Sequence, residues 1–156
     1  MGRFTMNATA SVIVERDGRI LLTREYADKK PENSIILSKP GGHLEDGETF
    51  QETAIREAFE ETGYRVRLLS IVGVYYMRFP DTSSVNITFT AELVDEKQEP
   101  ITENDIVEVL WMPVDEFKAR RSEWRRGSTI PSFDDYFAGK RHPLDLLHWS
   151  DHTKTP

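Results

Sequence analysis

The sequence predicts an α+β fold with a mixed β-sheet. Three observations predict it: several segments alternate apolar and polar residues as strands do, one central segment carries the signals of a capped helix, and the C-terminal part has helical spacing. Strands and helices that do not strictly alternate along the chain are typical of α+β domains. The 156 residues match the size of one compact domain, so we expect a single domain over residues 1–156.

The N-terminal part is expected to form a hairpin followed by a short strand. Small and apolar residues occupy every second position from Ala8 to Val14, and Asp17-Gly18 is a strong signal for a two-residue hairpin turn. Pro40-Gly41-Gly42 stops the strand that precedes it. The expected elements are strands over Asn7–Val14 and Ile20–Arg24, a loop over Tyr26–Ser34 and a strand over Ile35–Lys39.

The clearest helix is expected over Thr49–Thr62. Thr49 and Glu52 match a capping box, in which each side chain binds the other residue's backbone, and Gly63 suits the position just past the C-terminus. A stripe of apolar residues recurs at three- and four-residue spacing and is expected to face the core: Phe50, Ala54, Ile55, Ala58 and Phe59.

The remaining elements complete the predicted sheet and its helical C-terminal end. Pro80-Asp81 and Ser83-Ser84 mark the expected loop between two long strands. The expected elements are strands over Val66–Met77, Val85–Leu93 and Val107–Met112, helices over Asp115–Arg125 and Pro131–Gly139, and a packed turn over Pro143–Leu147.

Composition excludes several classes of function. The chain has 20 basic and 27 acidic residues and a net charge of −7, which disfavours a sequence-independent nucleic-acid binder. No apolar run reaches the roughly 20 residues that span a bilayer, and we expect neither a membrane anchor nor a secretory signal. Without cysteine, the chain cannot form disulfides, thiolate metal sites or a thiol nucleophile, and we expect a cytoplasmic protein.

Three glutamates of the central helix are the candidate metal ligands. Glu57 is three residues from Glu60 and four from Glu61, so all three side chains share one helical face, where like charges repel. Mg²⁺ or Mn²⁺ prefers carboxylate oxygens and would remove that repulsion. The structural alternative is a solvated helix surface with an ion-pair ladder of Glu52, Arg56 and Glu60.

The segment around this helix resembles the signature of the Nudix hydrolase family, whose founding member is MutT. The signature is Gly, five residues, Glu, seven residues, then Arg-Glu-U-x-Glu-Glu-x-Gly-U, where U is apolar. Every fixed position is present, and the two U positions hold a small and an amphipathic residue; the matching residues are Gly42, Glu48, Arg56, Glu57, Ala58, Glu60, Glu61, Gly63 and Tyr64.

The resemblance implies a Nudix fold, with a mixed sheet between helices and the signature as loop–helix–loop. It also implies Mg²⁺- or Mn²⁺-dependent attack of water on a diphosphate linked to another moiety. The metal ligands would be Glu57, Glu60 and Glu61, with the carbonyl of Gly41 as a further ligand. Arg56 would hold Glu48 and orient the carboxylates, and one glutamate of the cluster would be the base.

Several residues outside the helix are candidates for binding the substrate or completing the metal site. The candidate substrate contacts are Arg24, Gly41, Gly42 and His43. An extra carboxylate ligand would come from Glu103, Asp105 or Glu108, of which the last two are preferred. The aromatic residues Tyr75, Tyr76 and Phe79 either stack on a nucleobase or belong to the core.

The expected partner is a small nucleotide or pyrophosphate substrate, with a homodimer as an alternative to a monomer. Lys39 and the run from Gly139 to Leu147 are similar to NudJ-type phosphatases of the family, which implies nucleoside di- and triphosphates or a small pyrophosphate ester. Pro80 instead favours an ADP-ribose or nucleotide-sugar pyrophosphatase. A non-catalytic nucleotide sensor and an acidic adaptor are the non-enzymatic alternatives.

Overall fold

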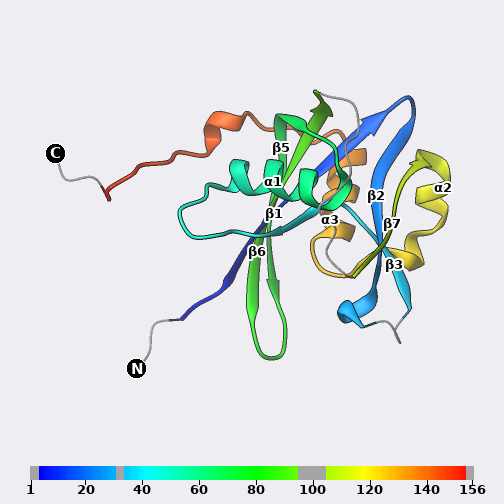
Figure 1. The fold of residues 1–156 in the computed structure, drawn as a ribbon, viewed down its shortest axis with the longest axis horizontal. Coiled ribbons are helices and arrows are strands. Elements are labelled where there is room, and N and C mark those ends of the chain that lie inside the picture. Colours follow the sequence, from blue (N-terminus) through cyan, green and yellow to red (C-terminus); the bar gives the residue numbers. More distant parts are fainter. Residues whose placement is uncertain (1–3, 31–33, 95–104, 154–156) are drawn as a thin grey trace.

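The computed structural model describes residues 4–30, 34–94 and 105–153. Figure 1 shows the helices packed around one twisted sheet. In these residues the elements are β1 (Asn7–Arg16), β2 (Arg19–Tyr26), β3 (Ile35–Ser38), β4 (Gly41–His43), α1 (Phe50–Thr62), β5 (Val66–Arg78), β6 (Ser83–Leu93), β7 (Ile106–Pro113), α2 (Val114–Ala119) and α3 (Thr129–Phe137), with short 3₁₀ turns at Ala27–Lys29, Arg121–Glu123 and Leu144–Leu146.

The sheet is mixed, as the sequence predicts. Its central order is β3-β2-β1-β6-β5, with β4 paired to β1 and β7 paired to β2. The β1–β6 pair is parallel and the other pairs are antiparallel. The registered pairs of β1 and β2 lie at their hairpin end, Glu15↔Ile20 and Arg16↔Arg19. Away from the hairpin, β1 pairs with β4 and β2 pairs with β3. The two strands therefore separate at that end of the sheet, and each pairs there with a different strand.

Two apolar clusters hold helices on the opposite faces of β1. Val12 and Val14 pack in the cluster that contains Ala54 and Ala58 of α1. Ile13, whose side chain points the other way because strand residues alternate, packs in the cluster of Phe117 and Phe133 from α2 and α3. The second cluster also stacks the ring of Trp124 on that of Phe117, with centroids 4.2 Å apart. The sheet therefore lies between helices, and the predicted α+β class is confirmed.

The predicted helix over Asp115–Arg125 is wrong in its second half. Helix α2 ends at Ala119, and a 3₁₀ turn follows at Arg121–Glu123. The chain folds back there so that Trp124 can stack on Phe117 and donate its indole N–H to the Phe117 carbonyl at 2.9 Å. Packing of one buried aromatic pair thus outweighs continuation of the helix.

Three smaller expectations also change. Gly41–His43 does not merely stop a strand but forms β4, which pairs with Thr9–Ser11 of β1. Ser83 and Ser84 belong to β6 rather than to a loop. On α1, Ile55 is 40% exposed, whereas Thr53 and Glu57 are buried. The helix is therefore turned so that a carboxylate, rather than the isoleucine of the apolar stripe, faces the body of the protein.

Candidate active site

The helix that carries the glutamates is fixed at both ends by its own sequence. The Thr49 side chain accepts the backbone N–H of Glu52, and the Glu52 side chain accepts the N–H of Thr49, which is the predicted capping box. Gly63 ends the helix in the left-handed conformation, at φ 75°, and donates its N–H to the Phe59 carbonyl. Because Glu52 is engaged in the cap, the alternative ladder of Glu52, Arg56 and Glu60 does not describe this helix.

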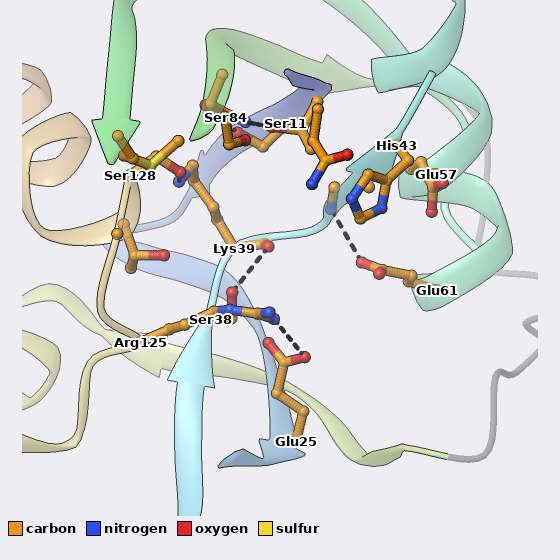
Figure 2. Close-up of a pocket in the computed structure, with 18 of the residues that line it drawn as sticks. Ser11, Glu25, Ser38, Lys39, His43, Glu57, Glu61, Ser84, Arg125 and Ser128 are labelled. Atoms are coloured by element: carbon orange, nitrogen blue, oxygen red, sulfur yellow. Dashed lines mark hydrogen bonds and ion pairs between the residues drawn. The ribbon is translucent and has the colours of Figure 1, made fainter. Parts of the chain in front are cut away.

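A cavity of about 450 Å³ lies between α1, β4 and the loop that precedes α3. Its lining includes the glutamates Glu57, Glu60 and Glu61, together with Gly41, Gly42 and His43. Figure 2 shows Glu57 and Glu61 extending from α1 toward the β4 strand beside His43. The structure therefore brings the predicted metal ligands and three of the four predicted substrate contacts to one cavity.

Arg56 connects the carboxylates of this site. Its Nε and Nη2 donate to the two oxygens of Glu48 at 2.5 and 3.0 Å, and its Nη1 donates to Glu57 and Glu60, each at 3.0 Å. Nη2 also donates to the His43 carbonyl at 3.0 Å. The planar guanidinium can make these bonds at once because its five N–H groups point in fixed directions.

The arginine changes the acidity of its partner. Hydrogen bonding to Arg56 lowers the pKa of Glu48 from 4.5 to about 2, with smaller contributions from the Glu45 amide and the Thr53 hydroxyl. The same bond to Glu48 raises the pKa of Arg56 further above its ordinary value. Glu48 is therefore a carboxylate at any neutral pH, and the pair is a permanent ionic clamp between the β4–α1 loop and α1.

Glycines let the β4 backbone approach the glutamates. A Cβ on Gly42 would overlap the carboxylate of Glu57, and a Cβ on Gly41 would overlap Ser11 of β1. The amide of Gly41 donates to Glu61 at 3.0 Å. Two glycines in succession are therefore required where the strand passes between β1 and α1, and side-chain-free backbone is exposed to the cavity.

The donor set matches a hard divalent cation, because the groups beside the glycines are carboxylate and backbone oxygens. In the present positions of the side chains, no three carboxylates or imidazoles of the described residues lie close enough together to hold one ion. Arg56 binds Glu57 and Glu60, while the Gly41 amide binds Glu61. The carboxylates are thus gathered at one cavity by hydrogen bonds that an ion would partly replace.

Comparison with known proteins identifies the family. The protein-family model described as NUDIX domain matches residues 5–133 of this chain. The chain belongs to the Nudix family. Phosphatase NudJ of Escherichia coli (strain K12) is 28% identical over 145 residues, which cover 92% of this chain and 92% of that protein.

Solved structures share the architecture of this Nudix protein. A NUDIX hydrolase from Nitrosomonas europaea superposes with a TM-score of 0.85 at 30% identity, covering 96% of this chain and 100% of that one. A protein described as an ADP compounds hydrolase gives a TM-score of 0.71 at 21% identity, covering 88% of this chain and 74% of that one, which shows the fold alone. The Nudix fold is confirmed, and the protein is a Nudix hydrolase, an enzyme that acts on phosphoric anhydrides.

Two predicted residues lie elsewhere in this Nudix hydrolase. Arg24 of β2 pairs with Glu108 of β7 at 3.0 Å, and neither residue is in the cavity lining. Asp105 does line the cavity and pairs with Lys29 at 3.5 Å. Glu103, the third candidate for the extra carboxylate, lies outside the described residues. Of the two candidates that the structure describes, Asp105 and Glu108, it is therefore Asp105 that lines the cavity.

The three aromatic candidates lie in different surroundings. Tyr75 is 9% exposed and donates its hydroxyl to Asp135 at 3.0 Å, and burial is the main cause that raises the pKa of Tyr75. Tyr76 is exposed and does not line the cavity. Phe79, with 43% of its side chain exposed, does line it, so Phe79 is the residue of the three that is placed to contact a substrate.

Sequence reasoning missed the wall of the cavity that faces the glutamates. It is formed by Lys39 after β3 and by residues 125–128 before α3. Burial, followed by the charge of Arg125, lowers the pKa of Lys39 to about 7, against the opposing effect of Glu25. The sequence marks Lys39 only by its place before Pro40, since its neighbours in this wall lie far along the chain.

No helix among the described residues is long and apolar enough to cross a membrane.

Proposed function

We propose that this Nudix hydrolase cleaves the phosphoanhydride of a nucleoside di- or triphosphate, or of a related pyrophosphate, with the help of Mg²⁺ or Mn²⁺. The observation that carries the proposal is the cluster of carboxylates around one arginine. Arg56 binds Glu48, Glu57 and Glu60 at the edge of a cavity that two glycines help to line. Such a cluster suits a reaction that needs charge neutralisation and an activated water beside a polyphosphate.

The cation would be held by Glu57, Glu60 and Glu61, with the Gly41 carbonyl as a further ligand and Asp105 as the extra carboxylate. When bound, a divalent cation neutralises phosphoryl oxygens and makes a coordinated water more acidic. The Glu48–Arg56 clamp keeps α1 and the β4–α1 loop in a fixed relation, so that the carboxylates would reach the cation by rotation of their side chains. Arg56 is in this sense a positioning residue.

The chain's own groups then account for the chemistry. The oxygen of a water attacks phosphorus, the P–O bond of the anhydride breaks, and the leaving phosphate departs with the electron pair. One glutamate of the cluster takes the proton of the attacking water. Gly41 and Gly42 let the β4 backbone lie against Ser11 and the Glu57 carboxylate while it lines the cavity, and His43 lies in the same lining for contact with the substrate.

We favour nucleoside phosphates over ADP-ribose or a nucleotide sugar, because the chain is similar over 92% of its length to a protein named as a phosphatase, NudJ. Pro80, on which that alternative depended, lies in the exposed turn between β5 and β6. The presence of both Glu60 and Glu61 favours an enzyme over a nucleotide sensor. The proposal includes a single domain over residues 1–156, action in the cytoplasm on small molecules rather than nucleic acid, and a monomer with a homodimer as the alternative.

The test is release of phosphate from a panel of nucleoside diphosphates, nucleoside triphosphates, ADP-ribose and nucleotide sugars. We expect release with Mg²⁺ or Mn²⁺ and none in excess chelator. The matched control for the site glutamates is Glu116→Gln, which removes a helical carboxylate 52% exposed on α2. The hydrolase proposal is wrong if no member of the panel is cleaved with either ion, or if cleavage continues unchanged in chelator.

A further inference from the structure

The end of the cavity away from the glutamates is positively charged. Lys39, Arg125, Arg126 and Ser128 form this end, which we call the lysine wall. Figure 2 shows the Lys39 side chain extending toward Ser128, on the opposite side of the cavity from Glu57 and Glu61. The cavity therefore has an acidic end and a basic end.

Lys39 is a buried amine that has no ionic partner among the described residues. It is 4% exposed, and its Nζ donates to the Ser128 hydroxyl at 3.1 Å. In the part of the chain that the structure describes, no carboxylate lies within ion-pair distance of Lys39. Glu25, the nearby acid, is bound by Arg125 at 2.8 Å. An ammonium has three N–H donors, and one neutral hydroxyl leaves two of them to the cavity.

The surroundings of Lys39 make an anion the matching ligand. Burying a cation is costly unless an opposite charge or several acceptors accompany it. The lysine wall has three basic side chains, and Glu25, the carboxylate beside it, is already paired with Arg125. The Ser128 hydroxyl precedes α3 but makes no capping bond to the helix, so it is available to the lysine and to a ligand.

We propose that the lysine wall binds a second phosphoryl group of the substrate, remote from the bond that is cleaved. The proposal rests on the proposed function, since the acidic end of the same cavity takes the scissile anhydride. The lining also includes Met77 and Phe79, which lie beside Gly127 next to the lysine wall and suit the rings of a nucleoside. The substrate class is then a nucleotide with an anhydride at one end and a further phosphoryl group, and a cavity of about 450 Å³ is within the usual range for such ligands.

The first test measures binding without catalysis. Inorganic phosphate is titrated into metal-free protein in chelator, and the backbone amide shifts of residues 127–129 are followed by NMR. Wild type and Lys118→Met, a control on the surface of α2, should bind with the same affinity. Lys39→Met should bind about 10- to 100-fold more weakly, the loss expected for a hydrogen bond to a charged group. Lys39→Gln keeps a donor for Ser128 but not the charge, and should bind as weakly as Lys39→Met.

The second test identifies the source of the phosphoryl group. KM is compared between ADP and ATP, which differ by a phosphate in the chain, and between ADP and adenosine 3′-phosphate 5′-diphosphate, which differ by a remote ester. One pair should show a lower KM for the extra phosphate in wild type, and Lys39→Met should abolish that preference with little change in kcat. A preference in neither pair overturns the inference.

The two proposals fail separately. If phosphate binds at residues 127–129 in wild type but no anhydride is cleaved, the hydrolase proposal fails and the anion site stands. If anhydrides are cleaved but phosphate binds equally to wild type and to both Lys39 variants, the lysine wall is not an anion site. Circular dichroism checks the fold of each variant, and the Gln variant decides the matter should the Met variant not fold.

Discussion

The Glu48–Arg56 clamp makes a quantitative prediction for Glu48→Gln. The substitution keeps the shape of the side chain and an oxygen for the Thr53 hydroxyl and the Glu45 amide, but removes the charge that faces Arg56. A pKa lowered from 4.5 to about 2 corresponds to about 3 kcal/mol of preference for the charged form. Because the pair lies at the rim, where water screens charges, we expect a loss of about 1–2 kcal/mol in the free energy of unfolding at pH 7.

The loss should depend on pH in a stated direction. The folded-state pKa of Glu48 lies below its unfolded value, so the stabilisation is fully present above about pH 5 and is lost as pH falls from 4.5 toward 2. Urea unfolding of both proteins in chelator, at pH 7 and at steps down to pH 2.5, measures this. The difference between wild type and Glu48→Gln should shrink steadily over that interval.

Glu45→Gln is the control for this experiment. Glu45 is also close to Arg56, at 3.8 Å, but its side chain is 70% exposed. Its removal should cost less than about 0.5 kcal/mol. Equal losses for Glu45→Gln and Glu48→Gln, or a Glu48→Gln loss that stays constant down to pH 2.5, would refute the clamp as the source of stability.

Three further predictions concern the glutamates, the glycine beside Glu57, and Tyr75 of the core. Glu60→Gln and Glu61→Gln should each lower turnover by at least ~10²-fold, as loss of a base or ligand does. The melting temperatures of the metal-free variants should stay close to that of wild type. Wild-type rates in both variants would show that the cluster is not catalytic. Gly42→Ala places a Cβ against the Glu57 carboxylate, so kcat should fall by about 10²-fold through displacement of that side chain, and an unchanged kcat would contradict the close approach. Tyr75→Phe removes the hydroxyl bound to Asp135 and should cost about 1 kcal/mol in urea unfolding without changing KM, whereas a raised KM would place Tyr75 at the substrate.

The elements that the sequence predicts best are those fixed by neighbouring residues. The bounds of α1 follow from Thr49, Glu52 and Gly63, which act within a few residues of the helix ends. The hairpin of β1 and β2 follows from Asp17-Gly18, both of which have positive φ. The Nudix signature also lies within one loop and one helix, so its residues reach the cavity together.

The features that the sequence does not reveal depend on distant segments. Lys39 meets Ser128 across 89 positions of the chain. Arg24, expected at the substrate, faces Glu108 because β2 and β7 are in register at that pair. Ile55 and Glu57 exchange their expected environments because packing against β1 and β4 sets the rotation of α1, which periodicity leaves free within part of a turn.

Binding of Mn²⁺ measured by electron paramagnetic resonance tests the central claim most directly. In metal-free protein titrated with Mn²⁺, wild type should take up the ion and lose the free-ion signal in a saturable way. The triple variant Glu57→Gln, Glu60→Gln, Glu61→Gln should leave that signal unchanged, while Glu116→Gln behaves as wild type. Equal uptake by the triple variant and wild type would show that these three glutamates do not hold the cation.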